Sequence, residues 1–439
     1  MYNALNNRIR NLLLRYDYSK STDPLQPLAS HITSLLTRQI PKTSDIRLTA
    51  ASEQWNLHKF ILSARSPYFS KKLAVTPETT VWKLANTIPP EAFQIGLLYL
   101  YLGDVPSDLG LSSKSFVSEE EVFKGIDKVS KQLEIESLWE GILSGGDRRI
   151  ARQRHQDEVT RGRDQIEAWY RNNVLKHKVD VDTSKATDVK WTKDNGIFAD
   201  VLLQADEEGE EESNSGQETP KIRNTVRPLN GIPIGPSAAS REPSTSRKPR
   251  KSVLFPVHRA MLLRSEYFQT MFASSFHEAQ ESECLHIVKV DCSPAVLEIV
   301  LDFLYTEKAD IPIELAIDVL FAADMLFIEK LKGKAAIVIS TVGMGNQNLS
   351  DPTHTEAGEE AEVEVEPINV YDVIRAGWFL KVQRLEEFSA RYLAYRLEDY
   401  IDEEDFEELI KESASRIEKR QETDSIELLD EYVVVYFPP

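Results

Sequence analysis

The chain has little cysteine and no long apolar run, and each of these features excludes a class of protein. Its 439 residues include two cysteines, Cys284 and Cys292, so the disulfide framework of a small secreted domain is excluded. The most apolar predicted helix, residues 315–331, carries four charged residues, which excludes a typical membrane span. The first residues contain no apolar core of signal-peptide length. We therefore expect a soluble intracellular protein, present in the cytoplasm or also in the nucleus.

The sequence has fewer positively charged than negatively charged residues. The sequence has 52 Lys and Arg against 71 Asp and Glu, a formal net charge of -19. Such a chain repels the phosphates of nucleic acids and the head groups of anionic lipids. Acidic runs at residues 206–212 and 359–366 carry much of this charge. We expect neither a nucleic-acid nor a membrane partner.

Residue patterns that build catalytic and metal sites are missing from the sequence. The eight histidines are scattered, and neither a Cys-x-x-Cys pair nor a His-Glu-x-x-His motif occurs, which argues against a metal site. There is no Gly-x-Ser-x-Gly elbow. The nearest approach to a phosphate-binding glycine loop, Gly343-Met344-Gly345, has Asn348 at the third glycine position. We predict no catalytic residue, no metal and no cofactor, and hence a protein that is not an enzyme.

What the chain does contain is an internal repeat, in which three blocks recur in the same order about two hundred residues apart. The matching blocks are residues 45–48 and 200–203, residues 57–69 and 257–268, and residues 90–101 and 294–305. The second block carries a histidine in each copy, His58 and His258, followed by Ser-x-Tyr-Phe. The third block runs from a proline to a tyrosine over the same spacing.

Each copy predicts a small α/β (α+β) unit with helices packed on a short sheet. A strand comes first, then a helix that begins near the histidine, a second strand, and an apolar helix after the proline, which suits the first turn of a helix. Residues 286–290 form the clearest strand because they are short, β-branched and followed by Ser293-Pro294. We expect both copies to adopt one fold.

These blocks resemble the BTB/POZ fold, and the whole ordered set occurs twice. The opening stretch, residues 2–13, is similar to the segment that joins ankyrin repeats to tandem BTB domains in the ankyrin repeat and BTB/POZ domain-containing family, although no ankyrin signature is present. The resemblance implies pairing of BTB domains, either within one chain or between two chains. It also implies a protein-interaction role.

The domain plan that follows has six parts. They are an N-terminal helical segment (1–44), a first BTB/POZ-like domain (45–143), a charged helical linker (144–196), a second BTB/POZ-like domain (197–340) with a disordered insertion (206–252), an acidic linker (341–367), and a helical C-terminal module (368–430) that resembles the BACK-like extension of BTB proteins. A basic cluster at residues 247–251 is either an ordinary feature of such a loop or a docking or nuclear-import motif.

Two acid–base pairs recur with the repeat. Asp45 with Lys59, and Asp200 with Arg259, resemble a charged pair that lies inside BTB domains near their dimer surface. A buried charge needs its partner, so we expect these pairs to be structural. His58 and His258 are expected to mark the fold as buried, hydrogen-bonded residues rather than catalytic ones.

The sharpest functional signal is Phe276-His277-Glu278. Many BTB proteins that recruit cullin-3 carry a hydrophobic-x-Glu tripeptide at this place, and the resemblance implies that Phe276 and Glu278, with Tyr305 as a further contact, bind a cullin. The alternative is that Phe276 caps the core beneath a loop. The first copy has Thr76-Pro77-Glu78 instead.

The function predicted from the sequence is that of a substrate adaptor for a cullin-3 type ubiquitin ligase. The second domain would hold the ligase, and the first domain or an N-terminal module would hold an unknown protein substrate. The alternative is a non-enzymatic BTB scaffold in transcriptional or cytoskeletal assembly.

Overall fold

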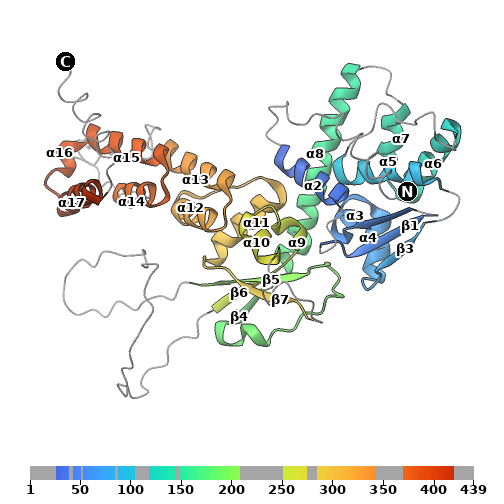
Figure 1. Cartoon of the computed structure of the whole chain (residues 1–439), viewed down its shortest axis with the longest axis horizontal. Coiled ribbons are helices and arrows are strands. Elements are labelled where there is room, and N and C mark those ends of the chain that lie inside the picture. The colour runs from blue at the N-terminus through green and yellow to red at the C-terminus, as the bar shows by residue number, and fades with distance from the viewer. Residues whose placement is uncertain are drawn as a thin grey trace, which may run out of the picture.

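A computed structural model gives the fold of the chain (Figure 1). The structure describes residues 26–38, 43–50, 53–84, 88–103, 118–143, 148–207, 251–273, 284–342 and 369–419. No helix among these residues is long and apolar enough to cross a membrane.

The first domain packs helices on a three-stranded sheet. Its strands run in the order β2-β1-β3, with β1 antiparallel to β2 and parallel to β3. The helix α2 (Gln26–Arg38) precedes it. In chain order the elements of the first domain are β1 (Ile46–Ala50), β2 (Glu53–Leu57), α3 (Lys59–Arg65), α4 (Pro67–Val75), β3 (Val81–Lys83), α5 (Pro90–Leu102), α6 (Glu119–Gln132) and α7 (Glu136–Leu143).

The second domain repeats this plan. Its sheet has the order β4-β6-β5-β7, and β5 pairs antiparallel with β6 and parallel with β7, as β1 pairs with β2 and β3. The elements are β4 (Val179–Asp182), β5 (Val201–Asp206), β6 (Lys251–Val257), α9 (Arg259–Leu262), α10 (Glu266–Ala273), β7 (His286–Lys289), α11 (Pro294–Thr306), α12 (Ala316–Met325) and α13 (Glu329–Val342). Short 3-10 turns lie at Leu175–His177, Thr183–Asp188 and Ile313–Leu315. The predicted α/β (α+β) fold class and its repetition are confirmed.

Local sequence explains the third block in both copies. Pro90 and Pro294 each stand in the first turn of their helix, where the missing proline N–H costs no hydrogen bond. Both helices are then buried over most of their length, with residues such as Phe93 and Val300 fully inside the core. This explains why their apolar residues are not confined to one stripe.

The structure corrects the predicted bounds of two segments. Asp206 ends β5 and pairs with Ser252 of β6, and the Glu207 N–H donates to the Lys251 carbonyl at 2.9 Å. The ends of the predicted insertion are therefore strand, and its remainder, residues 208–250, lies outside the described residues. The predicted helical linker contains β4, which adds to the edge of β6 with Val179 opposite Leu254.

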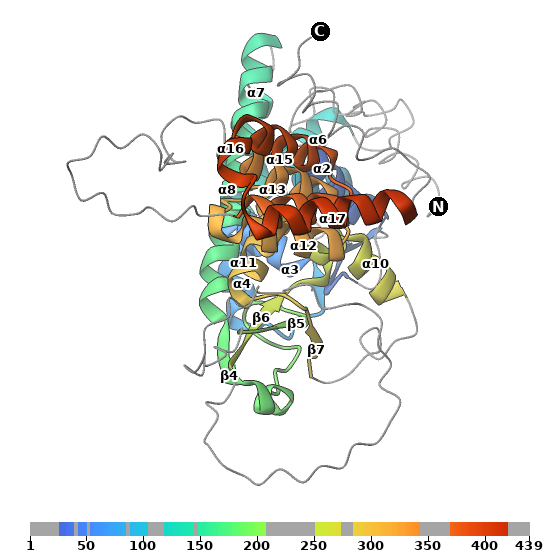
Figure 2. The ribbon, with the colours of Figure 1, turned by 90° about the vertical axis from the view of Figure 1, so that its left-hand side faces the viewer.

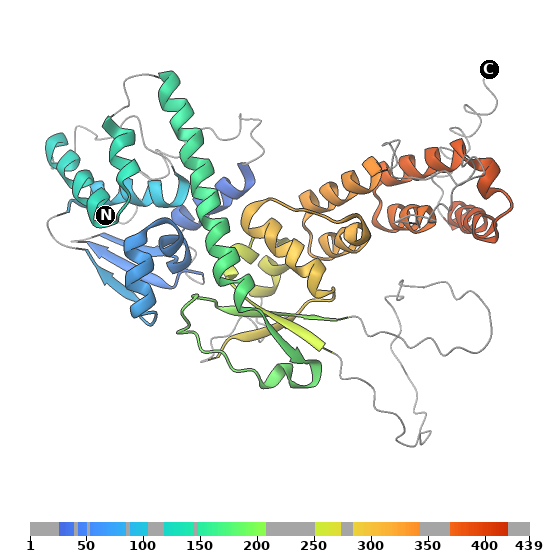
Figure 3. The ribbon, with the colours of Figure 1, turned by 180° about the vertical axis from the view of Figure 1, so that it is seen from behind.

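A long helix and a helical module complete the chain. The helix α8 (Arg148–Asn173) runs between the two domains (Figure 3). The C-terminal module consists of α14 (Val370–Leu380), α15 (Gln383–Tyr395), α16 (Leu397–Tyr400) and α17 (Glu404–Lys419). Its helices lie beyond α12 and α13 of the second domain (Figure 1), and the view of Figure 2 shows α17 in front, running across the module.

The hydrophobic core is continuous across both domains. A single cluster of buried side chains includes Leu48 and Phe93 of the first domain, Ile166 of α8, and Phe255 and Leu301 of the second domain. The C-terminal module adds a smaller cluster around Ile374 and Trp378. Because a shared core couples neighbouring units, the two domains and α8 form one packed body.

Candidate protein-interaction surfaces

The two repeated histidines occupy equivalent buried environments. The backbone N–H of His58 donates to the Tyr101 hydroxyl at 3.0 Å, and that of His258 donates to the Tyr305 hydroxyl at 3.0 Å. His258 Nε2 donates to the Ile197 carbonyl at 2.9 Å, so its Nδ1 accepts from the Tyr305 hydroxyl at 2.7 Å, and His58 Nδ1 is hydrogen-bonded to the Tyr101 hydroxyl at 3.0 Å. Burial lowers the pKa of His58 to about 3 and of His258 to about 4. Both imidazoles are neutral and structural in this arrangement.

The repeated aspartates bind the main chain at the start of the next helix. Asp45 Oδ1 accepts from the Lys59 backbone N–H at 2.8 Å, and Asp200 Oδ1 accepts from the Arg259 backbone N–H at 2.6 Å. Lys59 Nζ donates instead to the Pro77 carbonyl at 2.6 Å. The two residues of each predicted pair do meet, but through a backbone hydrogen bond, because the unpaired N–H groups of a helix start attract a carboxylate.

Burial governs the ionisation of these two carboxyl groups. It raises the pKa of Asp45 to about 7 and of Asp200 to about 6. The hydrogen bonds and positive charges of Lys59 and Arg259 oppose this, while the nearby charge of Asp200 adds to the effect on Asp45. An acid of the second domain therefore lies close enough to an acid of the first to influence it.

A repeated buried arginine was not predicted as a structural residue. Arg65 donates to the carbonyls of Leu100 at 3.0 Å and Tyr99 at 3.1 Å, at the end of α5. Arg264 likewise donates to the carbonyls of Phe303 and Leu304 and pairs with Glu307 in the second copy. Each arginine binds carbonyls in the last turn of its helix, and the Tyr99 and Phe303 carbonyls also accept from the capping backbone N–H groups of Gly103 and Glu307. The signal was visible, since an arginine precedes the repeated serine in both copies.

One side of α8 fits the first domain. Tyr99 donates through its hydroxyl to Glu158 at 2.7 Å, and Arg65 donates to the Gln165 side chain. Gly162 faces the Arg65 guanidinium so closely that a Cβ there would lie 3.0 Å from it. These α8 residues are spaced by three or four positions, so they share one face of the helix.

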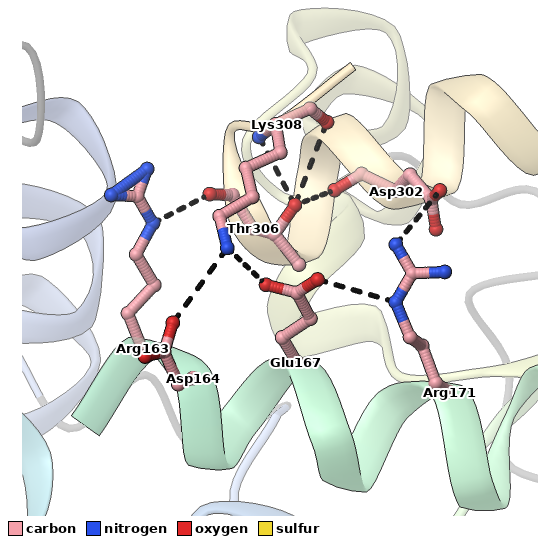
Figure 4. A network of polar contacts seen from close by, with 7 residues as sticks. All are labelled: Arg163, Asp164, Glu167, Arg171, Asp302, Thr306 and Lys308. Carbon is pink, nitrogen blue, oxygen red and sulfur yellow. Dashed lines mark hydrogen bonds and ion pairs between the residues drawn. The ribbon is translucent and has the colours of Figure 1, made fainter. Parts of the chain in front are cut away.

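The adjoining side of α8 fits the second domain (Figure 4). Arg163 Nε donates to the Thr306 carbonyl at 3.0 Å. Lys308 Nζ lies 2.6 Å from Glu167, and Arg171 lies 3.2 Å from Glu167. The network is arranged around the end of α11, where cations of α8 approach carbonyl and carboxylate oxygens. The ring of Tyr170 stacks on Tyr305 with centroids 4.3 Å apart.

The two domains also touch directly. The Phe60 ring of α3 stacks on the His258 ring at 4.4 Å. His31 of α2 is hydrogen-bonded through Nε2 to the Ala260 carbonyl at 2.7 Å. Trp169 of α8 lies 6.0 Å from Phe60 and 5.3 Å from His258, between the two domains. The two repeated domains therefore contact each other within one chain.

The predicted cullin contacts are placed only in part. Tyr305 is fully buried beneath Tyr170 and bonded to His258, so the prediction that it contacts a partner is wrong for this conformation. Its recurrence as Tyr101 in the first copy already favoured a core role. Phe276 and Glu278 lie outside the described residues, just beyond the end of α10. Within the described part of the chain there is no group of three or more potential ligands that could hold a metal ion.

Comparison with known proteins agrees with the repeat. The BTB/POZ domain family matches residues 35–137 and 250–341. BTB/POZ domain-containing protein 3 of Schizosaccharomyces pombe is 32% identical over 437 residues, which cover 98% of this chain and 67% of that relative. The chain belongs to the BTB/POZ domain proteins. As such it is a protein-interaction adaptor, and no catalytic family is indicated.

Further relatives of this BTB/POZ chain differ in how much they share. An ankyrin repeat-containing protein of Saccharomyces cerevisiae is 26% identical over 451 aligned positions, covering 98% of this chain and 74% of the relative. Kelch-like protein 25 of Homo sapiens is 29% identical over 181 residues, 41% of this chain and 26% of that protein. Among solved structures, the BTB domain of human gigaxonin matches with 21% identity and a TM-score of 0.21, covering 27% of this chain and 89% of that domain.

Proposed function

We propose that this BTB/POZ protein is an adaptor subunit of a cullin-3 type ubiquitin ligase and that its second domain binds the cullin. The tripeptide Phe276-His277-Glu278 in the second copy and the similarity to a kelch-like protein support this assignment. The substrate would be held by another part of the chain or by a further module. The cytoplasm or nucleus remains the predicted location.

The observation that carries the proposal is a difference between equivalent surfaces of the two domains. In the first domain Lys71 of α4 and Glu134 of the α6–α7 turn form an ion pair at 2.8 Å, with side chains 71% and 43% exposed. In the second domain Thr270 and Phe327 stand at these two positions. Phe327 is 58% exposed. A polar, paired surface in one copy thus corresponds to an exposed phenyl ring in the other.

The repeat itself fixes that correspondence. Ser66 Oγ donates to the Leu133 carbonyl at 2.7 Å, and Ser265 Oγ donates to the Leu326 carbonyl at 2.6 Å. The following residue, Glu134 or Phe327, has a positive φ of 55° or 53°. Both copies accept the cost of a left-handed residue, roughly 1–2 kcal/mol, so the turn belongs to the fold. Packing does not account for the exposed ring of Phe327, which suits an anchor for a partner.

Neighbouring features favour the same surface. Tyr267, at the start of α10, is 36% exposed, and α10 ends at Ala273, three residues before Phe276. In the first domain the equivalent segment, Thr76-Pro77-Glu78, is held by a hydrogen bond from Lys59 Nζ to the Pro77 carbonyl. The C-terminal module trails the second domain, where Lys332 Nζ donates to the Leu380 carbonyl at 3.0 Å. The second domain is therefore the better candidate for the ligase.

Binding of the purified full-length chain to the N-terminal domain of cullin-3 tests the proposal. We expect Phe327→Ala and Phe276→Ala each to weaken binding by about 1–2 kcal/mol, roughly tenfold, with little change in melting temperature. Glu278→Lys should also weaken it and alter its salt dependence. The matched control is Phe123→Ala, a 37% exposed phenylalanine of the first domain, which should bind normally.

Two outcomes would count against the proposal. If the unmodified chain does not bind cullin-3, the alternative of a scaffold outside the ubiquitin pathway is favoured. If Phe276→Ala lowers the melting temperature and binding falls only with unfolding, Phe276 is a core residue and not a contact.

A further inference from the structure

We infer that the two BTB/POZ domains of one chain are each other's pairing partner, so that the chain is a monomer whose pairing faces are already occupied. The inference concerns the surface formed by the start of α3 in the first domain and the start of α9 in the second. It stands whether or not the protein binds a cullin.

Equivalent surfaces of the two domains meet in this contact. His58 and His258 begin α3 and α9, and each follows a strand of its own sheet. Phe60, on the first turn of α3, stacks on His258, while Lys59 Nζ lies 5.9 Å from the Phe198 ring of the second domain. When two like units meet through the same patch, the pairing is closed and leaves no copy of the patch unused. A third domain has no equivalent face to bind among the described residues.

Helices outside the repeat cover the junction. His31 of α2 reaches Ala260 in α9, and Trp169 of α8 contacts the rings of Phe60, His258 and Phe198. The Trp169 and Phe198 rings are stacked, with an interplanar angle of 10°. A second chain would have to displace both α2 and α8 before it could reach this face.

The helix α8 makes pairing within the chain the favoured arrangement. One of its faces holds the first domain through Glu158 and Gln165, and the adjoining face holds the second through Arg163 and Glu167. Because α8 connects the domains covalently, each sees the other at an effective concentration of the order of millimolar. A second chain at micromolar concentration displaces the domain of the same chain only if it binds with far higher affinity.

The test uses the full-length chain with a protease site inserted between α7 and α8, at residues 144–147. We expect sedimentation to give the mass of one chain at all accessible concentrations. After cleavage of the folded protein, the two pieces should stay together as a single species. A mass of two chains for the uncut protein, or pieces that separate at once after cleavage, would overturn the inference.

A matched pair of tryptophan variants locates the contact. Trp169→Ala should weaken the association of the cleaved pieces about tenfold or more. Trp82→Ala, which removes a partly buried ring that contacts Tyr68 and Phe69 of its own domain, should leave it unchanged. If Trp169→Ala does not fold, the cleaved unmodified chain still decides the question. If the pieces associate as tightly with Trp169→Ala as with Trp82→Ala, the domains pair through another surface and the inference is contradicted.

Discussion

Asp45 and Asp200 are the residues whose ionisation should matter most for stability. Burial raises the pKa of Asp45 to about 7 and of Asp200 to about 6 in the folded chain, whereas an unfolded chain has an ordinary aspartate near 3.9. A raised pKa means that the folded state binds a proton more tightly than the unfolded state. The resulting stabilisation is complete below about pH 4 and is lost as the pH rises through about 6 and 7.

Asparagine at both positions should remove this pH dependence. The amide oxygen can still accept from the Lys59 and Arg259 backbone N–H groups, but it does not ionise. Between pH 5 and 7.5 we expect the free energy of unfolding of the Asp45→Asn, Asp200→Asn chain to fall less than that of the unmodified chain. The difference has an upper limit of about 1.4 kcal/mol per pH unit for each carboxyl group. Urea unfolding across this range measures it, with Asp157→Asn on the exposed face of α8 as the control. Parallel profiles would show that the carboxylates remain ionised throughout.

For single residues, the sequence showed which side chains are structural better than it showed which groups they contact. His58 and His258 were recognised because they recur, and their buried tyrosine partners recur with them. The same reasoning applied to Tyr305 would have assigned it to the core, since Tyr101 matches it. The backbone hydrogen bonds of Asp45 and Asp200 could not be predicted, because acid and base residues of matching spacing are compatible with either an ion pair or a helix cap.

At the scale of elements, α8 joins the two domains because its two faces fit different surfaces. Gly162 lets the helix approach Arg65, whose guanidinium is held by the carbonyls of Tyr99 and Leu100. A methyl group at Gly162 would press on this buried arginine. By contrast, Gly333 in α13 is exposed, and a Cβ there would meet nothing within 4 Å.

These two helical glycines provide a matched test of the α8 contact. Gly333→Ala should stabilise the chain by about 0.5–1 kcal/mol, the usual gain in helix propensity. Gly162→Ala should lose that gain and end less stable than Gly333→Ala by about 1 kcal/mol or more, because Arg65 must shift. Thermal unfolding of the two variants measures the difference. Equal stabilisation by both would mean that α8 does not approach Arg65 this closely.

Helices and strands were predictable where the sequence blocks repeat. They were missed where a tertiary contact determines the secondary structure. β5, β6 and β7 follow from the repeated blocks and β-branched residues. β4, Val179–Asp182, alternates valine with aspartate, and the described sheet of the first domain has no equivalent strand. It becomes a strand because the edge of β6 offers unpaired backbone groups, which single-sequence reasoning about the linker could not reveal.

At the scale of the whole molecule, the first domain, α8 and the second domain share one core, and the C-terminal module extends from the second domain (Figure 3). The sequence predicted two similar domains and a charged helix between them. It left open whether the domains pair within the chain or between chains, because that choice depends on which faces of α8 they occupy. The two copies differ on the surface where one has Phe327 and the other Glu134. The sequence did not show this difference, because the two turns are recognised as equivalent by the hydrogen bonds of Ser66 and Ser265.

The central claim is that one chain forms one paired unit with a single cullin-binding surface, on its second domain. Native mass spectrometry of the full-length chain mixed with the N-terminal domain of cullin-3 tests it most directly. We expect a complex of one adaptor chain and one cullin domain, alongside free single chains. A complex of two chains with two cullin domains would contradict pairing within the chain, whereas free single chains that bind no cullin would contradict the proposed function and leave the pairing intact.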